Sequence, residues 1–136
     1  MNEYVCVGSD AEILAERPAG LTGVRVFAAE DEPMLLWALE QILAELGCEV
    51  IGTATQVADA LAFVKDNIFD VAVLDGRLAD GHIQPVADLL FARGTPMVIT
   101  SGGARWETAA KFNDALYLQK PYKCEDLKKV LLAAMA

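Results

Sequence analysis

The chain has few basic residues, a single histidine and no long apolar run. Eleven Lys and Arg residues stand against 20 Asp and Glu residues, which gives a formal net charge of -9 without any basic stripe. Because phosphate backbones are bound by clustered Lys and Arg, we expect no direct binding to nucleic acid. No segment approaches the roughly 20 apolar residues of a membrane span, and the N-terminus carries acids where a signal peptide carries bases. We therefore expect a cytoplasmic protein that does not bind membranes.

Cysteine is also scarce, and its spacing excludes two kinds of site. Cys6, Cys48 and Cys124 are an odd number, without the close spacings of metal knuckles or redox pairs. The simplest expectation is that all three thiols are reduced. A Gly-rich turn is missing as well, because the first apolar run continues into AAEDEP at residues 28–33. The chain therefore lacks the dinucleotide-binding fingerprint.

Short apolar runs alternate with helix-period segments from residue 24 onward. The runs predict strands at 24–28, 49–52, 70–75, 96–100 and 117–119. The intervening segments predict helices that start at Pro33, follow an N-cap at Thr55, span 83–92 before Gly94, span 104–113, and carry Leu127, Val130 and Leu131 near the end. This alternation is typical of a parallel α/β sheet. Right-handed crossovers favour a doubly wound, flavodoxin-like fold of five βα units with strand order 2-1-3-4-5.

The length fits one domain, which we place at residues 23–136. Residues 1–22 lie outside the repeat and form an N-terminal extension to which the sequence assigns no role. Trp37 is predicted to lie on a packed helix face. The single histidine, His82, is predicted to be a surface or helix-start residue rather than a ligand.

Polar side chains follow the predicted strands at the edge where such sheets form their sites. Glu30 and Asp31 follow the first strand, Asp75 ends the third, Ser101 follows the fourth and Lys120 the fifth. Three carboxylates in close proximity repel one another unless a cation lies between them. Oxygen ligands of this kind suit Mg²⁺, and a carboxylate beside a metal and a lysine can accept a phosphoryl group. Asp75 is the best-placed nucleophile.

Four motifs in this order resemble the receiver domain of bacterial two-component response regulators. They are AEDEP (29–33), VAVLDGRLADG (71–81), MVITSGG (97–103) and LQKPY (118–122). The resemblance implies a stand-alone receiver, and that a sensor histidine kinase phosphorylates Asp75. It also implies that the chain is not an enzyme beyond its own phosphoryl transfer and autodephosphorylation.

The resemblance assigns further roles residue by residue. It implies that Glu30, Asp31, Asp75 and the backbone carbonyl of Arg77 hold Mg²⁺. Lys120 pairs with the phosphoryl group, and the bond from Lys120 to Pro121 resembles the cis peptide of the family.

A switch is implied by the same resemblance. Ser101 stands at the position of the switch hydroxyl and Tyr117 at that of the switch aromatic. The implied output surface combines the helix at 104–113, the strand at 117–119 and the last helix. It binds an unknown downstream protein, and the resemblance also allows a homodimer.

The sequence departs from the family in the acidic pair and in the loop after Asp75. Glu30 stands where Asp is commoner, Ala79 replaces a frequent Pro, and Gly76 loosens the loop. One alternative is therefore a degenerate receiver that acts as a phosphorylation-independent interaction module. Another is a phosphatase of the haloacid dehalogenase type, although the acidic pair precedes Asp75 here whereas that family has its nucleophile first.

Overall fold

The computed structural model describes residues 20–102 and 116–136, and its centre is a five-stranded parallel sheet. In spatial order the strands are β2 (Glu49–Ala54), β1 (Arg25–Ala29), β3 (Val71–Asp75), β6 (Met97–Ser101) and β7 (Leu116–Gln119). Numbered as the five predicted strands, this is the order 2-1-3-4-5, so the predicted sheet is confirmed. The helix predicted at 104–113 lies outside the described residues.

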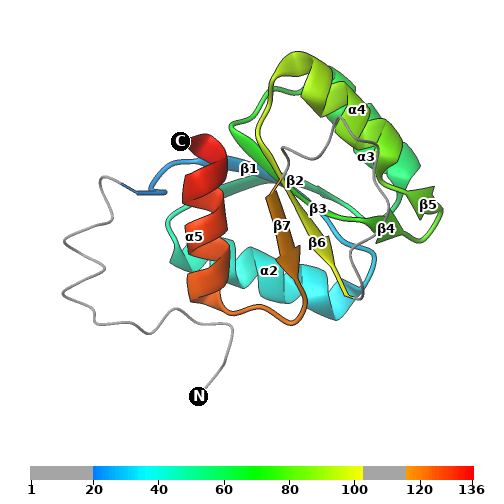
Figure 1. Ribbon diagram of the computed structural model, residues 1–136. Coiled ribbons are helices and arrows are strands. Elements are labelled where there is room, and N and C mark those ends of the chain that lie inside the picture. Colours follow the sequence, from blue (N-terminus) through cyan, green and yellow to red (C-terminus); the bar gives the residue numbers. More distant parts are fainter. Residues whose placement is uncertain (1–19, 103–115) are drawn as a thin grey trace.

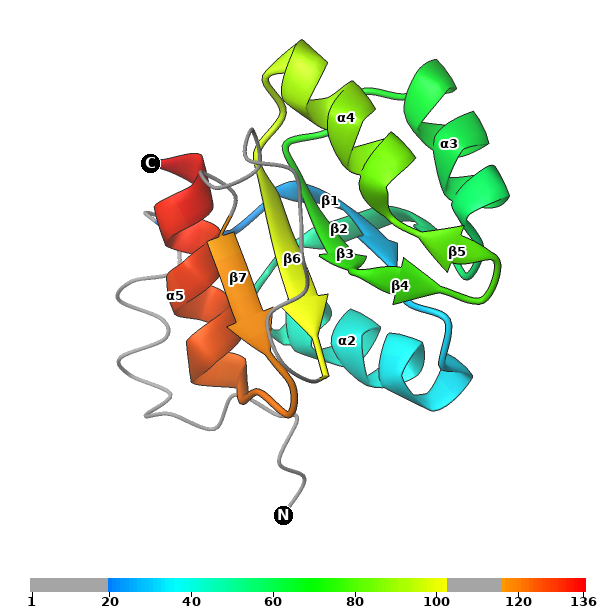
Figure 2. The ribbon, with the colours of Figure 1, turned by 45° about the vertical axis from the view of Figure 1, so that its right-hand side comes forward.

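Helices cover both faces of the sheet, as Figures 1 and 2 show. The helices α2 (Pro33–Glu45) and α5 (Cys124–Met135) pack on one face, and α3 (Val57–Asp66) and α4 (Gln84–Arg93) pack on the other. The fold is therefore the doubly wound α/β class predicted from the alternation of apolar runs. None of the helices in the described ranges has the length and apolar character needed to cross a bilayer.

The two central strands send alternate side chains into two separate cores. Val26 and Val73 join the core under α2 and α5, whereas Phe27 and Leu74 join the core under α3 and α4. All five residues of β3 are buried, as expected for a central parallel strand with helices on both sides. Leu21, just before β1, is also buried in the α2/α5 core.

The ends of the helices follow the sequence in some places and not in others. Pro33 begins α2, and α4 ends before Gly94, which has the left-handed conformation that favours glycine. The predicted N-cap at Thr55 is wrong. The N-cap of α3 is Gln56, and its side chain makes no capping hydrogen bond. The prediction failed because a carboxylate distant in sequence, Asp80, binds the free N–H groups of this helix instead.

Two further expectations from the sequence need correction. Trp37 is 51% exposed, because the buried stripe of α2 runs through Ala38, Leu39, Ile42 and Leu43. Cys124 is disulfide-bonded, so the expectation of reduced cysteines is wrong for this residue, while Cys48 is a free thiol. A disulfide depends on how closely two sulfur atoms approach in space, which cysteine spacing alone does not show.

The segment after Asp75 forms a small hairpin where the sequence predicted only a loop. Its strands are β4 (Arg77–Leu78) and β5 (Gly81–His82), with Arg77 paired to His82 and Leu78 paired to Gly81. The chain then enters α4 through Ile83, which is fully buried. The hairpin therefore lies directly between the best-placed nucleophile and the next helix.

Candidate functional site

The carboxyl ends of three strands bring Glu30, Asp75 and Lys120 together. The Nζ atom of Lys120 lies 2.7 Å from Oε1 of Glu30 and 3.1 Å from Oδ2 of Asp75, so one ammonium group bridges both carboxylates. Glu30 follows β1, Asp75 ends β3 and Lys120 follows β7. The side chains of the two acids are 4% and 12% exposed, and that of Lys120 is 18% exposed. The sequence prediction that these residues meet at one edge is correct.

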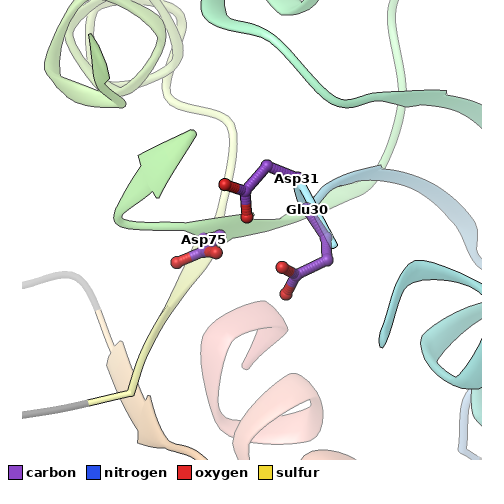
Figure 3. Close-up of side chains that lie close together, drawn as sticks. All are labelled: Glu30, Asp31 and Asp75. Carbon is purple, nitrogen blue, oxygen red and sulfur yellow. The ribbon is translucent and has the colours of Figure 1, made fainter. Parts of the chain in front are cut away.

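Asp31 completes a cluster of three carboxylates. Glu30, Asp31 and Asp75 each offer an oxygen atom, and these atoms all lie within 4.8 Å of one another. Figure 3 shows the three carboxylate groups gathered around one space. Carboxylate oxygens are the hard ligands that Mg²⁺ prefers, and an ion that takes one or two of these three directly would retain several waters. The donor set therefore matches the cation that the sequence predicted.

The pKa values at this site reflect burial opposed by ion pairing. Burial raises the pKa of Glu30 to about 7, the hydrogen bond from Lys120 opposes this shift, and the negative charge of Asp75 adds to it. Burial by itself would lower the pKa of Lys120, but the hydrogen bond with Glu30 and the charge of Asp75 give a net increase. Lys120 is therefore a stable cation, whereas Glu30 is the group that can take up a proton near neutral pH.

The acidic groups are further oriented by backbone N–H groups. Glu32 donates its N–H to Oε2 of Glu30 at 3.2 Å, and Arg77 donates its N–H to Oδ1 of Asp75 at 3.4 Å. The N–H of Gly76 is bonded to the carbonyl of Thr100 at 2.9 Å, which joins the end of β3 to β6. Arg77 is exposed, and its guanidinium is a permanent cation without an acceptor atom, so only the backbone carbonyl of this residue could ligate a metal.

A cavity of about 150 Å³ opens beside Asp75. It is lined by Asp75, Gly76, Arg77, His82, Ser101 and Gly102. This is several times the roughly 30 Å³ that one water occupies in the liquid, so the cavity has room for a group larger than water.

Two adjacent hydroxyl residues end β6, and only one of them lines this cavity. Thr100 is buried, and its hydroxyl lies 3.5 Å from the carbonyl of Leu74. Ser101, at the predicted position of the switch hydroxyl, is half-buried and is one of the residues that line the cavity beside Asp75. Tyr117 pairs with Ile99 across the strands and packs against the α3/α4 core, so it does not line the cavity.

The bond from Lys120 to Pro121 is cis, as predicted. Two residues near the site are not among the predicted site residues. His82, predicted to be a surface or helix-start residue, is half-buried in β5 and lines the cavity, and Asp80 binds α3 from the tip of the hairpin. The pattern ADG before His82 is a turn signal that could have indicated the hairpin, but no periodicity places either side chain.

Comparison with known proteins yields relatives, although no family model matches the chain. The chain is 32% identical over 116 residues to the transcriptional regulatory protein DesR of Bacillus subtilis (strain 168), a match that covers 82% of this chain and 58% of DesR. It is 38% identical to SdrG from Sphingomonas melonis Fr1, whose solution structure superposes with a TM-score of 0.73 over 85% of this chain and 98% of that one. A BeF3-activated conformation of SdrG is 36% identical, with a TM-score of 0.70 and the same coverage.

These relatives and the parallel sheet with its acidic edge define one class, the receiver domains of response regulators. The chain belongs to this family. It spans about half the length of the curated relatives that it matches, 58% of DesR and 52% of PdtaR of Mycobacterium tuberculosis.

Proposed function

We propose that this chain is a signalling domain that accepts a phosphoryl group on Asp75. The observation that supports this most directly is the arrangement of Lys120, which bridges Asp75 and Glu30 beside the cavity lined by Ser101. The phosphodonor we propose is a sensor histidine kinase. The degenerate alternative is not favoured, since the acceptor, both acids and the lysine are all present and converge.

The transfer needs a nucleophilic carboxylate and positioned charges from the protein. A carboxylate oxygen of Asp75 forms a bond to phosphorus, the bond from phosphorus to the donor nitrogen breaks, and the electron pair stays on that nitrogen. Lys120 donates hydrogen bonds to the transferring oxygens, which spreads their negative charge. Water then hydrolyses the acyl phosphate, which releases inorganic phosphate and returns Asp75 to its carboxylate form. The only acyl phosphate that the chain would hydrolyse is therefore the one formed on its own Asp75.

Glu30, Asp31, Asp75 and the carbonyl of Arg77 are the groups we propose to hold Mg²⁺. When bound, this cation neutralises charge on the phosphoryl oxygens. The proposal has support from the three converging carboxylates. Asp31 is half-buried and makes none of the ion pairs that occupy its neighbours, so it is the carboxylate best able to ligate directly.

We further propose that Ser101 and Tyr117 relay phosphorylation to a downstream protein. Ser101 lies at the cavity and Tyr117 lies one strand away on β7, which shares an edge of the molecule with α5. A phosphoryl oxygen that attracts the hydroxyl of Ser101 would shift the population of conformers at β7 and α5. The surface that carries these two elements is our candidate for the partner site.

The first test is incubation with Mg²⁺ and acetyl phosphate, followed by intact mass measurement. We expect a gain equal to one phosphoryl group, which Asp75→Asn abolishes and which chelation of Mg²⁺ suppresses. Wild-type protein that gains no mass, or a gain that survives Asp75→Asn, would overturn the proposal.

The second test addresses the switch. Titration with beryllofluoride and Mg²⁺, followed by NMR, should shift amide signals at the site and also on β7 and α5. The BeF3-activated form of SdrG makes this probe appropriate. Shifts confined to the residues around Asp75 would contradict the relay while leaving the acceptor role intact.

A further inference from the structure

The β4–β5 hairpin forms one wall of the cavity beside Asp75, yet it has little means of holding its own shape. Each strand has two residues, and Ala79 and Asp80 form the turn. In the described part of the chain only glycines have a positive φ, so neither Ala79 nor Asp80 has one. The primed turns that preorganise two-residue hairpins are therefore not adopted. Since even longer isolated hairpins are marginally stable, contacts from outside must fix this one.

The base of the hairpin is fixed by the sheet and the core. The N–H of Ile83 is bonded to the carbonyl of Gly76 at 3.0 Å, and the N–H of Gly76 is bonded to the carbonyl of Thr100 at 2.9 Å. Leu78 and Ile83 are 3% and 0% exposed in the α3/α4 core. These contacts anchor the ends of the hairpin but do not reach the turn.

The tip is fixed by the carboxylate of Asp80. One oxygen, Oδ1, accepts the N–H of Val57 at 2.5 Å, and the other, Oδ2, accepts the N–H of Ala58 at 3.1 Å. Figure 2 shows the hairpin beside the first turn of α3. The hydrogen bond from Val57 lowers the pKa of Asp80, which keeps the carboxylate ionised.

The same contact completes the N-terminus of α3. The first N–H groups of a helix have no partner within it, and Gln56 offers no side-chain cap. Asp80 satisfies two of these groups from 23 residues away and places a negative charge at the positive end of the helix. The carboxylate of Asp80 therefore connects the hairpin to α3, and the buried residues of α3 pack in the core.

We propose that Asp80 is a positioning residue for phosphoryl transfer at Asp75. It holds the hairpin so that Gly76, Arg77 and His82 line the cavity. The inference rests on the proposed function. Without the Asp80 contact, Asp75, Glu30 and Lys120 keep their places at the strand ends, but one wall of the site is released.

The experiment compares wild type with Asp80→Ala, Asp80→Asn and Asp70→Ala. Asn keeps an oxygen that can accept the N–H of Val57 but has no charge. Asp70 provides the matched control, because its Oδ2 also accepts a backbone N–H, that of Arg25 at 2.8 Å. It precedes β3, roughly 16 Å from Asp75 at about 3.3 Å per residue. Thermal unfolding first establishes a temperature at which all four proteins are folded.

Two quantities are then measured at that temperature, the rate of phosphoryl gain from acetyl phosphate and the Mg²⁺ dissociation constant. We expect Asp80→Ala to slow phosphorylation and weaken Mg²⁺ binding by about tenfold, as loss of outer-shell support commonly does. Asp80→Asn should recover much of both, and Asp70→Ala should match wild type. A merely structural role would move unfolding without moving either quantity in the folded protein.

Three outcomes overturn the inference. Asp80→Ala with the wild-type rate and Mg²⁺ affinity would do so, as would Asp70→Ala with losses equal to those of Asp80→Ala. Wild-type protein that gains no phosphoryl group would overturn both the inference and the proposed function. The first two outcomes leave the proposed function standing, so the two failures are distinguishable.

Discussion

Replacing Lys120 with Met removes the one ammonium group that bridges Glu30 and Asp75, while keeping a side chain of similar length. In metal-free protein the two carboxylates are then left without this cation, at 4% and 12% exposure. Removing one partner of a buried ion pair commonly costs about 3–5 kcal/mol of stability, because the remaining charge is uncompensated. The cost here should be smaller, since Lys120 is 18% exposed and Glu30 can protonate. We expect about 1–3 kcal/mol at pH 8.

The dependence on pH follows from the pKa of Glu30. Burial raises this pKa to about 7 from an ordinary 4.5, so the folded state binds more protons than the unfolded state between these values, and stability falls as pH rises through that window. Lys120 lowers the pKa of Glu30, so Lys120→Met extends the fall to higher pH. At pH 6 Glu30 is largely protonated in both proteins, and the remaining cost comes from Asp75 alone. The loss should therefore be clearly larger at pH 8 than at pH 6.

Urea unfolding in the presence of a chelator, at pH 6 and pH 8, measures the free energy of unfolding directly. The double variant Glu30→Gln, Lys120→Met should lose most of the difference between the two pH values. Lys129→Met, on the exposed side of α5, is the control and should change little at either pH. Equal losses for Lys120→Met at pH 6 and pH 8, or no loss at pH 8, would refute the account of the ion pair.

Three further predictions concern separate parts of the molecule. Mg²⁺ affinity should be lower at pH 6 than at pH 8, because Glu30, with a pKa of about 7, must lose its proton to ligate. Calorimetry should show that the affinity of the Glu30→Gln variant depends less on pH. Gly52→Ala would place a Cβ atom 2.4 Å from the ring of Phe63, so urea unfolding should show a loss of about 1–3 kcal/mol, and an unchanged midpoint would contradict this. Burial raises the pKa of Cys48 to about 11, so only about a thousandth of this thiol is ionised at pH 8, and iodoacetamide should label it far more slowly in folded than in urea-unfolded protein. Equal labelling rates would refute that burial.

The sheet and the core of the site could be predicted because both depend on one regularity. In a parallel sheet all strands end at the same edge, so residues that follow separate apolar runs must meet there. Glu30, Asp75 and Lys120 lie up to 90 residues apart, yet the end of each run was enough to place them together. Burial of β3 was predictable for the same reason, since a continuous apolar run requires cover on both faces.

The hairpin and the capping of α3 could not be predicted, because they depend on contacts between segments rather than on periodicity. Thr55 was a reasonable N-cap by local rules, but Asp80 reaches the same N–H groups from another element. The prediction that Trp37 lies on a packed face failed for a related reason. Its spacing allows either side of the stripe of α2, and only the packing of this helix against β1 and β2 decides which side is buried.

The departure at Glu30 is explained in part by the contacts of its longer side chain. One carboxylate oxygen of Glu30 accepts a hydrogen bond from the N–H of Glu32, and the other accepts one from the ammonium of Lys120. Both oxygens therefore have a hydrogen-bond partner in the protein. Lys120 likewise divides its ammonium between Glu30 and Asp75. A phosphoryl group on Asp75 would add negative charge near both Lys120 and Glu30, which would compete with Glu30 for the ammonium and raise the pKa of Glu30 further. Phosphorylation and the protonation of Glu30 are therefore coupled through one lysine, so the pH dependence of phosphoryl gain should change when Glu30 becomes Gln.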